Sequence, residues 1–209
     1  MDLPAVIAAE RRALADLLEP LTPAQWEAPS LCGGWSVKDV ATHLMIGPTI
    51  DQADAGRAVM AARGNIGRAM DLMVADRRDR PTSQVVADLR EHAESTFAPP
   101  VVGLRGPLTD IRLHALDIAI PLGLEVEHTP EVWPVVLDFL VSWRARVGFV
   151  PGGRPRLAYV VTDLDWHHGS GPRVAGPAAY LAMALCRRTA GLARLEGPGL
   201  ERFTAWVER

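Results

Sequence analysis

The sequence predicts a mainly α-helical protein: a helical bundle over about residues 1–150, followed by a small α+β domain over residues 151–209. Apolar residues recur at helical spacings over most of the first part. The segment PGGRP, residues 151–155, interrupts this pattern and is typical of a domain boundary. The residues directly after it, RLAYVVTDLDWHHG, are rich in types that favour strands.

The first helix is indicated by its spacing and by its end. Residues 3–18 carry leucine and isoleucine at helical spacings, and Pro20 stops the pattern. Thr22 and Pro23 then suit the N-cap and the first position of a short helical turn through Trp26.

Further helices follow from caps and breakers. Ser36 opens an S-x-x-D capping box ahead of an apolar run. We expect Gly47-Pro48 to bend or break that helix, which then resumes to about residue 63. Residues 82–97 form another amphipathic stretch, and residues 98–107 form a loop rich in proline and glycine.

The remaining elements are read in the same way. Thr129-Pro130 opens a helix that ends near Gly148. Beyond the boundary we expect a strand, a short partner strand at Val174, and a helix ended by Gly191. A strand and a short helix complete the chain.

Composition limits the class of protein. The 209 residues are 48% hydrophobic and 22% charged, as in a soluble globular protein with one large domain or a main domain and an appendage. A formal net charge of −3 argues against a nucleic-acid partner, which favours a basic protein. Heavy use of Ala, Gly, Pro and Arg beside a single lysine is typical of a GC-rich bacterial genome.

The small number of cysteines and the lack of a long uncharged apolar segment indicate the compartment and the partners. Two cysteines, Cys32 and Cys186, are too few for a disulfide framework, so a reducing cytoplasm is expected. Residues 1–18 carry charges within their apolar pattern, and no later window reaches the ~18 uncharged apolar residues of a membrane span. We expect a small-molecule partner, no nucleic acid, no membrane, and a monomer or homodimer.

The most informative stretch is the expected helix over residues 108–122, which Gly123 ends at its C-cap. Asp110, His114 and Asp117 fall at i, i+4 and i+7 and therefore share one stripe of this helix. Apolar residues occupy almost every other side, which predicts burial. Buried acidic and imidazole groups must be paired or ligated, because a lone buried charge is costly.

An acid and a histidine four residues apart can reach one divalent metal, and His43 is the candidate for a third ligand from another helix. Three ligands with one open position are typical of a catalytic site. The alternative is that His43 and His114 are hydrogen-bonded core histidines and that Asp110 and Asp117 pair with arginines. Spacing by itself does not decide between them.

A resemblance adds to these observations. The segment LTPAQWEAPSLCGGWSVKDVATHL resembles the N-terminal segment of the mycothiol-dependent maleylpyruvate isomerase family, within the DinB-like superfamily. The family signature W-x-x-P-x-x-C-x-G-W-[ST]-V-x-D-[VL]-x-x-H-[LI] is matched from Trp26 to Leu44. The family's E-x-x-x-H-x-x-D helix is similar to the run from Asp110 to Asp117. The tail TDLDWHHGSGPRVAGPAAYLAMALCRR resembles the family's small C-terminal domain.

The resemblance implies a DinB-like four-helix bundle with a small C-terminal α+β domain, and a divalent metal, zinc in this family, held by His43, Asp110 and His114. Asp110 stands where the family has glutamate. Its side chain is one methylene shorter, so its helix must sit closer to the metal, or a water must bridge.

The activity that the resemblance implies is a metal-dependent, mycothiol-using isomerase or S-transferase. The metal would lower the pKa of the thiol, and the thiolate would add to a small electrophilic substrate. Asp117 is the candidate for orienting a histidine ligand, and no residue is assigned to cofactor binding. Two alternatives remain: a DinB-like metal-binding or sequestration protein without turnover, and a metallohydrolase that uses metal-bound hydroxide.

Overall fold

The computed structural model describes residues 1–126, 129–150 and 152–209. The chain forms two compact units. The N-terminal unit comprises Met1–Phe97 and Asp110–Glu127, and the C-terminal unit comprises Ala98–Thr109 and His128–Arg209. The domain boundary predicted between residues 150 and 151 stays a prediction.

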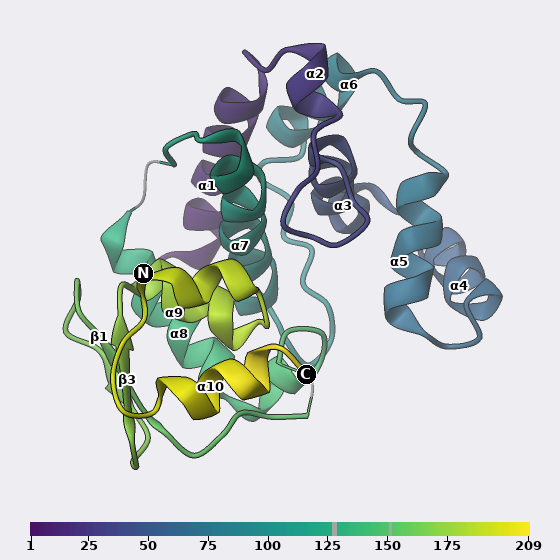
Figure 1. Ribbon diagram of the computed structural model, residues 1–209. Coiled ribbons are helices and arrows are strands. Elements are labelled where there is room, and N and C mark those ends of the chain that lie inside the picture. The colour runs from purple at the N-terminus through teal and green to yellow at the C-terminus, as the bar shows by residue number, and fades with distance from the viewer. Residues whose placement is uncertain (127–128, 151) are drawn as a thin grey trace. The chain divides into compact units, whose positions relative to one another are not determined.

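The N-terminal unit is helical throughout the elements that the structure describes (Figure 1). Its helices are α1 Leu3–Leu18, α2 Pro23–Trp26, α3 Val37–Thr49, α4 Gln52–Ala61, α5 Ile66–Ala75, α6 Thr82–Glu91 and most of α7 Arg105–Leu122. Residues from α1, α3, α6 and α7 converge on one hydrophobic core cluster. The expected four-helix bundle is therefore present.

The predicted caps are confirmed in this unit. The Ser36 hydroxyl accepts from the backbone N–H of Asp39, and the Asp39 carboxylate accepts from the backbone N–H of Ser36. Thr22 and Gln25 form the same reciprocal box at the start of α2. These bonds satisfy backbone donors that the first turn of a helix leaves unpaired.

Helix α3 passes the expected break and ends at Thr49. Pro48 lies in the last turn, so its missing N–H and its ring disturb only the end of the helix. The Thr49 hydroxyl also donates to the carbonyl oxygen of Met45. A Cβ at Gly47 would lie 2.5 Å from the ring of Phe97, so a larger residue here requires that side chain to shift.

Helix α5 was not anticipated from the sequence. Its N-cap is Asn65, whose side chain accepts from the backbone N–H of Arg68 at 3.0 Å. Helices α4 and α5 pack on each other, and α5 contacts α3 around a second, smaller apolar cluster. This pair of helices lies beside the four-helix bundle.

The C-terminal unit contains the small α+β part. Its elements are the 3₁₀ turn Pro130–Val132, α8 Trp133–Val141, the 3₁₀ turn Trp143–Arg146, β1 Ala158–Val161, β2 His167–His168, β3 Arg173–Gly176, α9 Ala178–Leu185, the 3₁₀ segment Thr189–Arg194 and α10 Leu200–Val207. The strands form one sheet in the order β2-β1-β3, with β2 antiparallel and β3 parallel to β1. The mainly α-helical fold with a small α+β part is confirmed.

The stretch expected as one strand after the boundary is a hairpin, β1 and β2. Asp163, in the connection between the strands, accepts a hydrogen bond from the backbone N–H of Ala178 at 2.9 Å. Because this bond ties the connection to the start of α9, the chain turns here. The predicted strand in the tail is a single bridge between Ala175 and Glu196.

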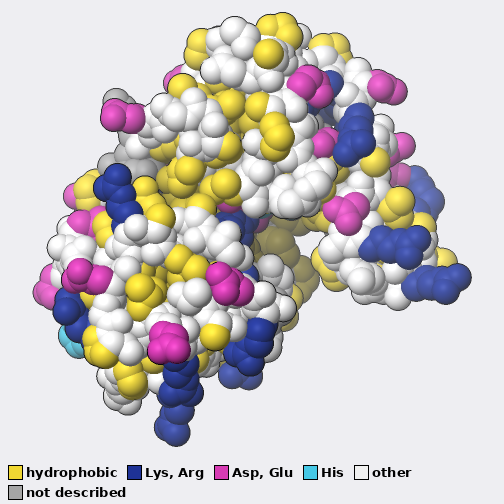
Figure 2. Space-filling model, viewed as in Figure 1, with side chains coloured by type: hydrophobic (Ala, Val, Ile, Leu, Met, Phe, Trp, Pro, Cys, Tyr) yellow, Lys and Arg dark blue, Asp and Glu magenta, His cyan; other side chains and the backbone are white. Residues whose placement is uncertain are grey.

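Nothing in the described helices has both the length and the apolar character that crossing a membrane requires. Acidic and basic side chains are scattered among hydrophobic ones on the face that Figure 2 shows.

Candidate metal centre

Helix α7 presents an acid, a histidine and a second acid to the interior of the N-terminal unit. Asp117 is fully buried, and His114 is 7% exposed. Ile111 and Ile118 of the same helix belong to the core cluster of the bundle. Burial of this polar stripe is therefore imposed by the apolar residues around it, as the sequence predicts.

His43 of α3 meets this stripe. Its Nε2 atom lies 3.3 Å from Oδ2 of Asp110, and Nε2 of His114 lies 3.3 Å from Oδ1 of the same carboxylate. The two imidazole rings are 4.9 Å apart between centroids and nearly perpendicular. The three side chains named from the sequence are thus brought together, and the aspartate reaches both histidines despite its shorter side chain.

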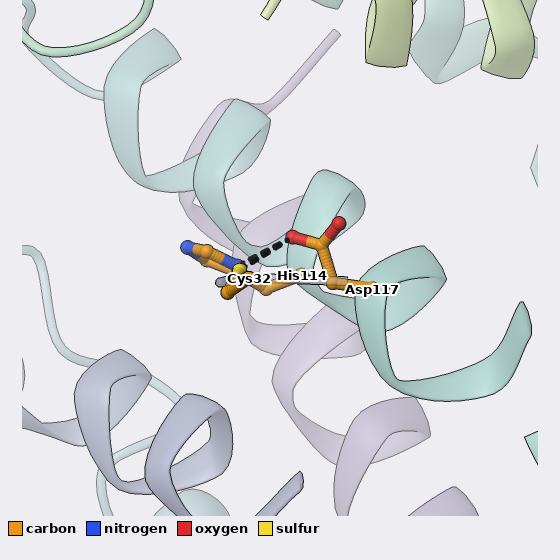
Figure 3. A group of neighbouring side chains, drawn as sticks. All are labelled: Cys32, His114 and Asp117. Atoms are coloured by element: carbon orange, nitrogen blue, oxygen red, sulfur yellow. Dashed lines mark hydrogen bonds and ion pairs between the residues drawn. The ribbon is translucent and has the colours of Figure 1, made fainter. Parts of the chain in front are cut away.

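Other residues support the two histidines. Nδ1 of His114 lies 2.9 Å from Oδ2 of Asp117, and the Cys32 thiol donates to that same oxygen at 3.1 Å (Figure 3). With Asp117 as the acceptor from Nδ1–H, the Nε2 atom of His114 is the one turned toward Asp110, and it could bind a cation after losing its own proton. The ring of Trp35 lies 5.1 Å from that of His43 between centroids.

The charges are strongly coupled. Burial raises the pKa of Asp110, but the charges of His114 and His43 and their hydrogen bonds outweigh it and hold the pKa well below its ordinary value. Burial lowers the pKa of His114, and Asp110, Asp117 and Cys32 together raise it well above its ordinary value. The carboxylate of Asp110 is therefore ionised, which is the form that binds a metal.

Two sets of side chains in the described chain could hold a metal, and they share His114. One comprises His43, Asp110 and His114, and the other Cys32, His114 and Asp117; within each set the donor atoms lie within 4.8 Å of one another. The second set is engaged in its own hydrogen bonds around the fully buried Asp117. In the first set, the side chain of Asp110 is 32% exposed, so an incoming molecule can reach it.

The donor set of His43, Asp110 and His114 fits a divalent metal of the zinc type. Imidazole nitrogen and carboxylate oxygen are ordinary zinc ligands, and three protein ligands with an accessible side match a catalytic site. Both carboxylates lie beside histidines: Asp110 contacts His43 and His114, and Asp117 contacts His114.

The sequence match to known proteins falls on this helical unit. Residues 7–99 match the family model described as the mycothiol maleylpyruvate isomerase N-terminal domain. The match covers the N-terminal part of this chain. His43 lies inside the matched residues, whereas Asp110 and His114 follow them in the chain. The expected resemblance is thus confirmed for the segment that carries the W-x-x-P-x-x-C signature.

Solved structures extend the likeness in fold. Crystal structures of the mycothiol-dependent maleylpyruvate isomerase and of a histidine mutant of it each match with a TM-score of 0.61, at 13% identity, over 94% of this chain and 92% of theirs. A curated relative, the phenylalanine–tRNA ligase alpha subunit of Mycobacterium avium (strain 104), is 35% identical over 86 residues. That match spans 41% of this chain and only 25% of the relative's length.

Two contacts were not evident from the sequence. Cys32 is half-buried and hydrogen-bonded to Asp117. The loop reaches α7 because the backbone N–H of Leu31 donates to the carbonyl oxygen of Asp117. The fixed C-x-G-W spacing ahead of the cap of α3 was the available signal. Arg112, on another side of α7, is buried and pairs with Glu10 at 3.3 Å.

Proposed function

We propose that this protein is a metal-dependent enzyme that uses mycothiol, or a similar small thiol, to add to a small electrophilic substrate, as an isomerase or an S-transferase. The observation that carries the proposal is the convergence of His43, Asp110 and His114 on one accessible point. The N-terminal domain match and the fold likeness support the choice of thiol chemistry over other uses of such a centre.

His43, Asp110 and His114 are proposed to hold one divalent metal, zinc being the best fit to these ligands. A bound metal would supply a Lewis acid that lowers the pKa of a thiol, so that a thiolate forms near neutral pH. Asp117 accepts the Nδ1 proton of His114 and keeps its Nε2 atom directed at Asp110. Cys32 in turn fixes the orientation of the Asp117 carboxylate.

The reacting thiol is proposed to come from a cofactor rather than from the protein. The sulfur of Cys32 already contacts Asp117 and His114. Cys186 is buried near the end of α9, in the other unit. Neither cysteine forms a disulfide, which agrees with the cytoplasm as the proposed compartment.

Elemental analysis of the untagged protein tests the metal centre first. We expect one divalent ion per chain, lost in His43→Ala and in His114→Ala but kept in the matched control His167→Ala, whose side chain is exposed on β2. Asp110→Ala should weaken retention and Asp110→Glu should preserve it. Unchanged metal content in both histidine variants would refute the centre.

Thermal denaturation with added mycothiol then separates the enzyme from its alternatives. A thiol that binds the metal-loaded folded state raises its melting temperature by mass action, and chelation should abolish the shift. Cys32→Ser should keep the metal and the shift. Equal shifts with and without chelator, or none, would favour a metallohydrolase or a sequestration protein.

A further inference from the structure

Three arginines of the C-terminal unit surround one glycine-rich loop. Arg146, Arg154 and Arg156 line a hollow of about 320 Å³ beside residues 152–155. None of the described residues that line it is acidic. No ion pair joins any of these three guanidiniums to a carboxylate in the described part of the chain. The hollow therefore concentrates positive charge that the protein itself does not neutralise.

Arg154 is held in place within this hollow. Its Nη1 atom donates to the carbonyl oxygen of Val141 at 2.7 Å, and its Nη2 atom donates to Nε2 of His168 at 2.6 Å. These bonds use two of the five N–H donors of a guanidinium and leave the others available. A guanidinium that is already ordered loses less conformational entropy when it binds a ligand.

His168 is held in place by Trp166. Its ring stacks on that of Trp166, and the indole N–H of Trp166 donates to Asp138 at 2.9 Å. Burial and the charge of Arg154 lower the pKa of His168, whereas Asp138 opposes them. The neutral imidazole can therefore accept the Arg154 hydrogen bond, and this row of contacts reaches from α8 to the hollow.

The loop brings the arginines close together. Gly152 and Gly153 have φ values of +75° and +74°, a conformation that residues with a Cβ rarely adopt. A Cβ added to Gly153 would lie 3.6 Å from Nη2 of Arg146. Burial lowers the pKa of Arg154, and the neighbouring charge of Arg146 lowers it further, against an opposing effect of Tyr159. The charges of the two guanidiniums thus oppose each other within one hollow.

A second hollow on the same unit shares residues 152–155. Its volume is about 720 Å³, and Arg202 and Arg209 are among its lining residues. It has no acidic residue in its described lining either. The loop is consequently flanked by positive charge on both sides.

We propose that the hollow lined by Arg146, Arg154 and Arg156 binds a small oxyanion, a molecule with carboxylate or phosphate groups. Arginine pairs with both groups through two parallel N–H···O bonds, which Lys does not reproduce. An anion placed in this hollow offsets the repulsion between Arg146 and Arg154 and reaches donors that have no acidic partner among the described residues. The confined volume fits a small molecule, whereas a nucleic acid would need an extended basic surface. This site does not depend on the metal centre.

Calorimetric titration at low ionic strength tests the proposal, with inorganic phosphate and succinate as separate probes at matched chloride. The full-length protein should bind at least one of them, and the stronger probe tells phosphate from carboxylate as the preferred group. Arg146→Gln and Arg156→Gln should each weaken binding about tenfold, the loss expected for one charge-assisted contact. Arg173→Gln, an exposed arginine on β3 that does not line the hollow, is the matched control and should change affinity less than about twofold.

Three results would overturn the proposal. The first is no binding of either probe by the wild-type protein. The second is an equal loss of affinity in Arg173→Gln, which would show attraction to overall charge only. The third is binding that survives Arg146→Gln and Arg156→Gln but disappears in His43→Ala or with chelator, which would place the anion at the metal centre. The melting temperature of each variant is measured to check that the variant is folded.

Discussion

The two units treat charge in opposite ways. In the N-terminal unit, buried charged side chains are common, and each contacts an opposite charge or a row of carbonyl oxygens. Arg112 pairs with Glu10, and Arg11 donates to the carbonyl oxygens of His92, Ala93 and Ser95. In the C-terminal unit, none of the described buried residues is charged. Six of its arginines line the two hollows beside the glycine-rich loop: Arg146, Arg154, Arg156, Arg187, Arg202 and Arg209.

The contrast shows two uses of the same residue type. A buried, paired arginine ties helices together in one arrangement, because breaking the pair leaves a charge without solvent. An exposed, unpaired arginine contributes little to stability but remains available to a ligand. The proposed metal centre lies in the unit where buried charges have partners, and its three side chains, His43, Asp110 and His114, contact one another.

The largest effect should come from breaking the buried pair of Arg112 and Glu10. We expect Glu10→Ala to lower the free energy of unfolding by about 3 kcal/mol, because Arg112 is 1% exposed and stays buried. Urea denaturation measures this. A double variant, Glu10→Leu with Arg112→Met, should recover much of the loss, since an apolar pair of similar volume often replaces a buried ion pair. A loss below about 1 kcal/mol in Glu10→Ala would contradict the assigned importance of the pair.

The next effect concerns the support of His114. We expect Asp117→Asn to weaken metal binding about 10–100-fold, the range found for outer-sphere partners of metal-bound histidines. Competition with a chelating dye measures the affinity. Asp88→Asn on α6, which removes a buried carboxylate that contacts Arg80 and Gln84, is the control. Equal metal affinity in Asp117→Asn and wild type would remove Asp117 from the centre.

A smaller effect should appear in the pH dependence of the metal-free protein. The pKa of His114 is raised above its ordinary value of 6.5, so its contribution to stability is complete below pH 6.5 and is lost as pH rises through the higher folded-state pKa. The pKa of Asp110 is lowered from 3.8, so its contribution is lost only as pH falls below that value. In the presence of chelator, the melting temperature of the wild-type protein should therefore fall from neutral to alkaline pH. The melting temperature of His114→Gln should fall less over the same range. If the melting temperatures of the wild-type protein and His114→Gln changed equally with pH, the interaction of His114 with Asp110 and Asp117 would not contribute to stability as stated.

The smallest effect is expected in the C-terminal unit. Arg202→Gln should change the free energy of unfolding by less than about 0.5 kcal/mol, because the side chain is exposed and makes no ion pair with a described carboxylate. Chemical denaturation of Arg202→Gln and Glu10→Ala under the same conditions compares their free energies of unfolding directly. If Arg202→Gln lowered the free energy of unfolding nearly as much as Glu10→Ala, arginines would matter equally for stability in the two units, which would contradict the comparison.

Much of the helical unit could be predicted because its signals are local. The capping box at Ser36 sets the start of α3, and the spacing of Asp110, His114 and Asp117 places them on one face whatever else the chain does. Helix α5 was missed because its amphipathic run is short and lies among charged residues. Its place is decided by packing on α3 and α4, which no local pattern reports.

By itself, the sequence determined the helical class, most of the helices other than α5, and the stripe on α7, since periodicity and caps act within a few residues. Only the tertiary structure decided that His43 meets Asp110, that the Cys32 thiol reaches Asp117, and that three arginines surround one loop. These contacts join residues far apart in the chain. Their geometry depends on how apolar faces pack and on where each buried polar group finds its partner, and both are properties of the whole fold.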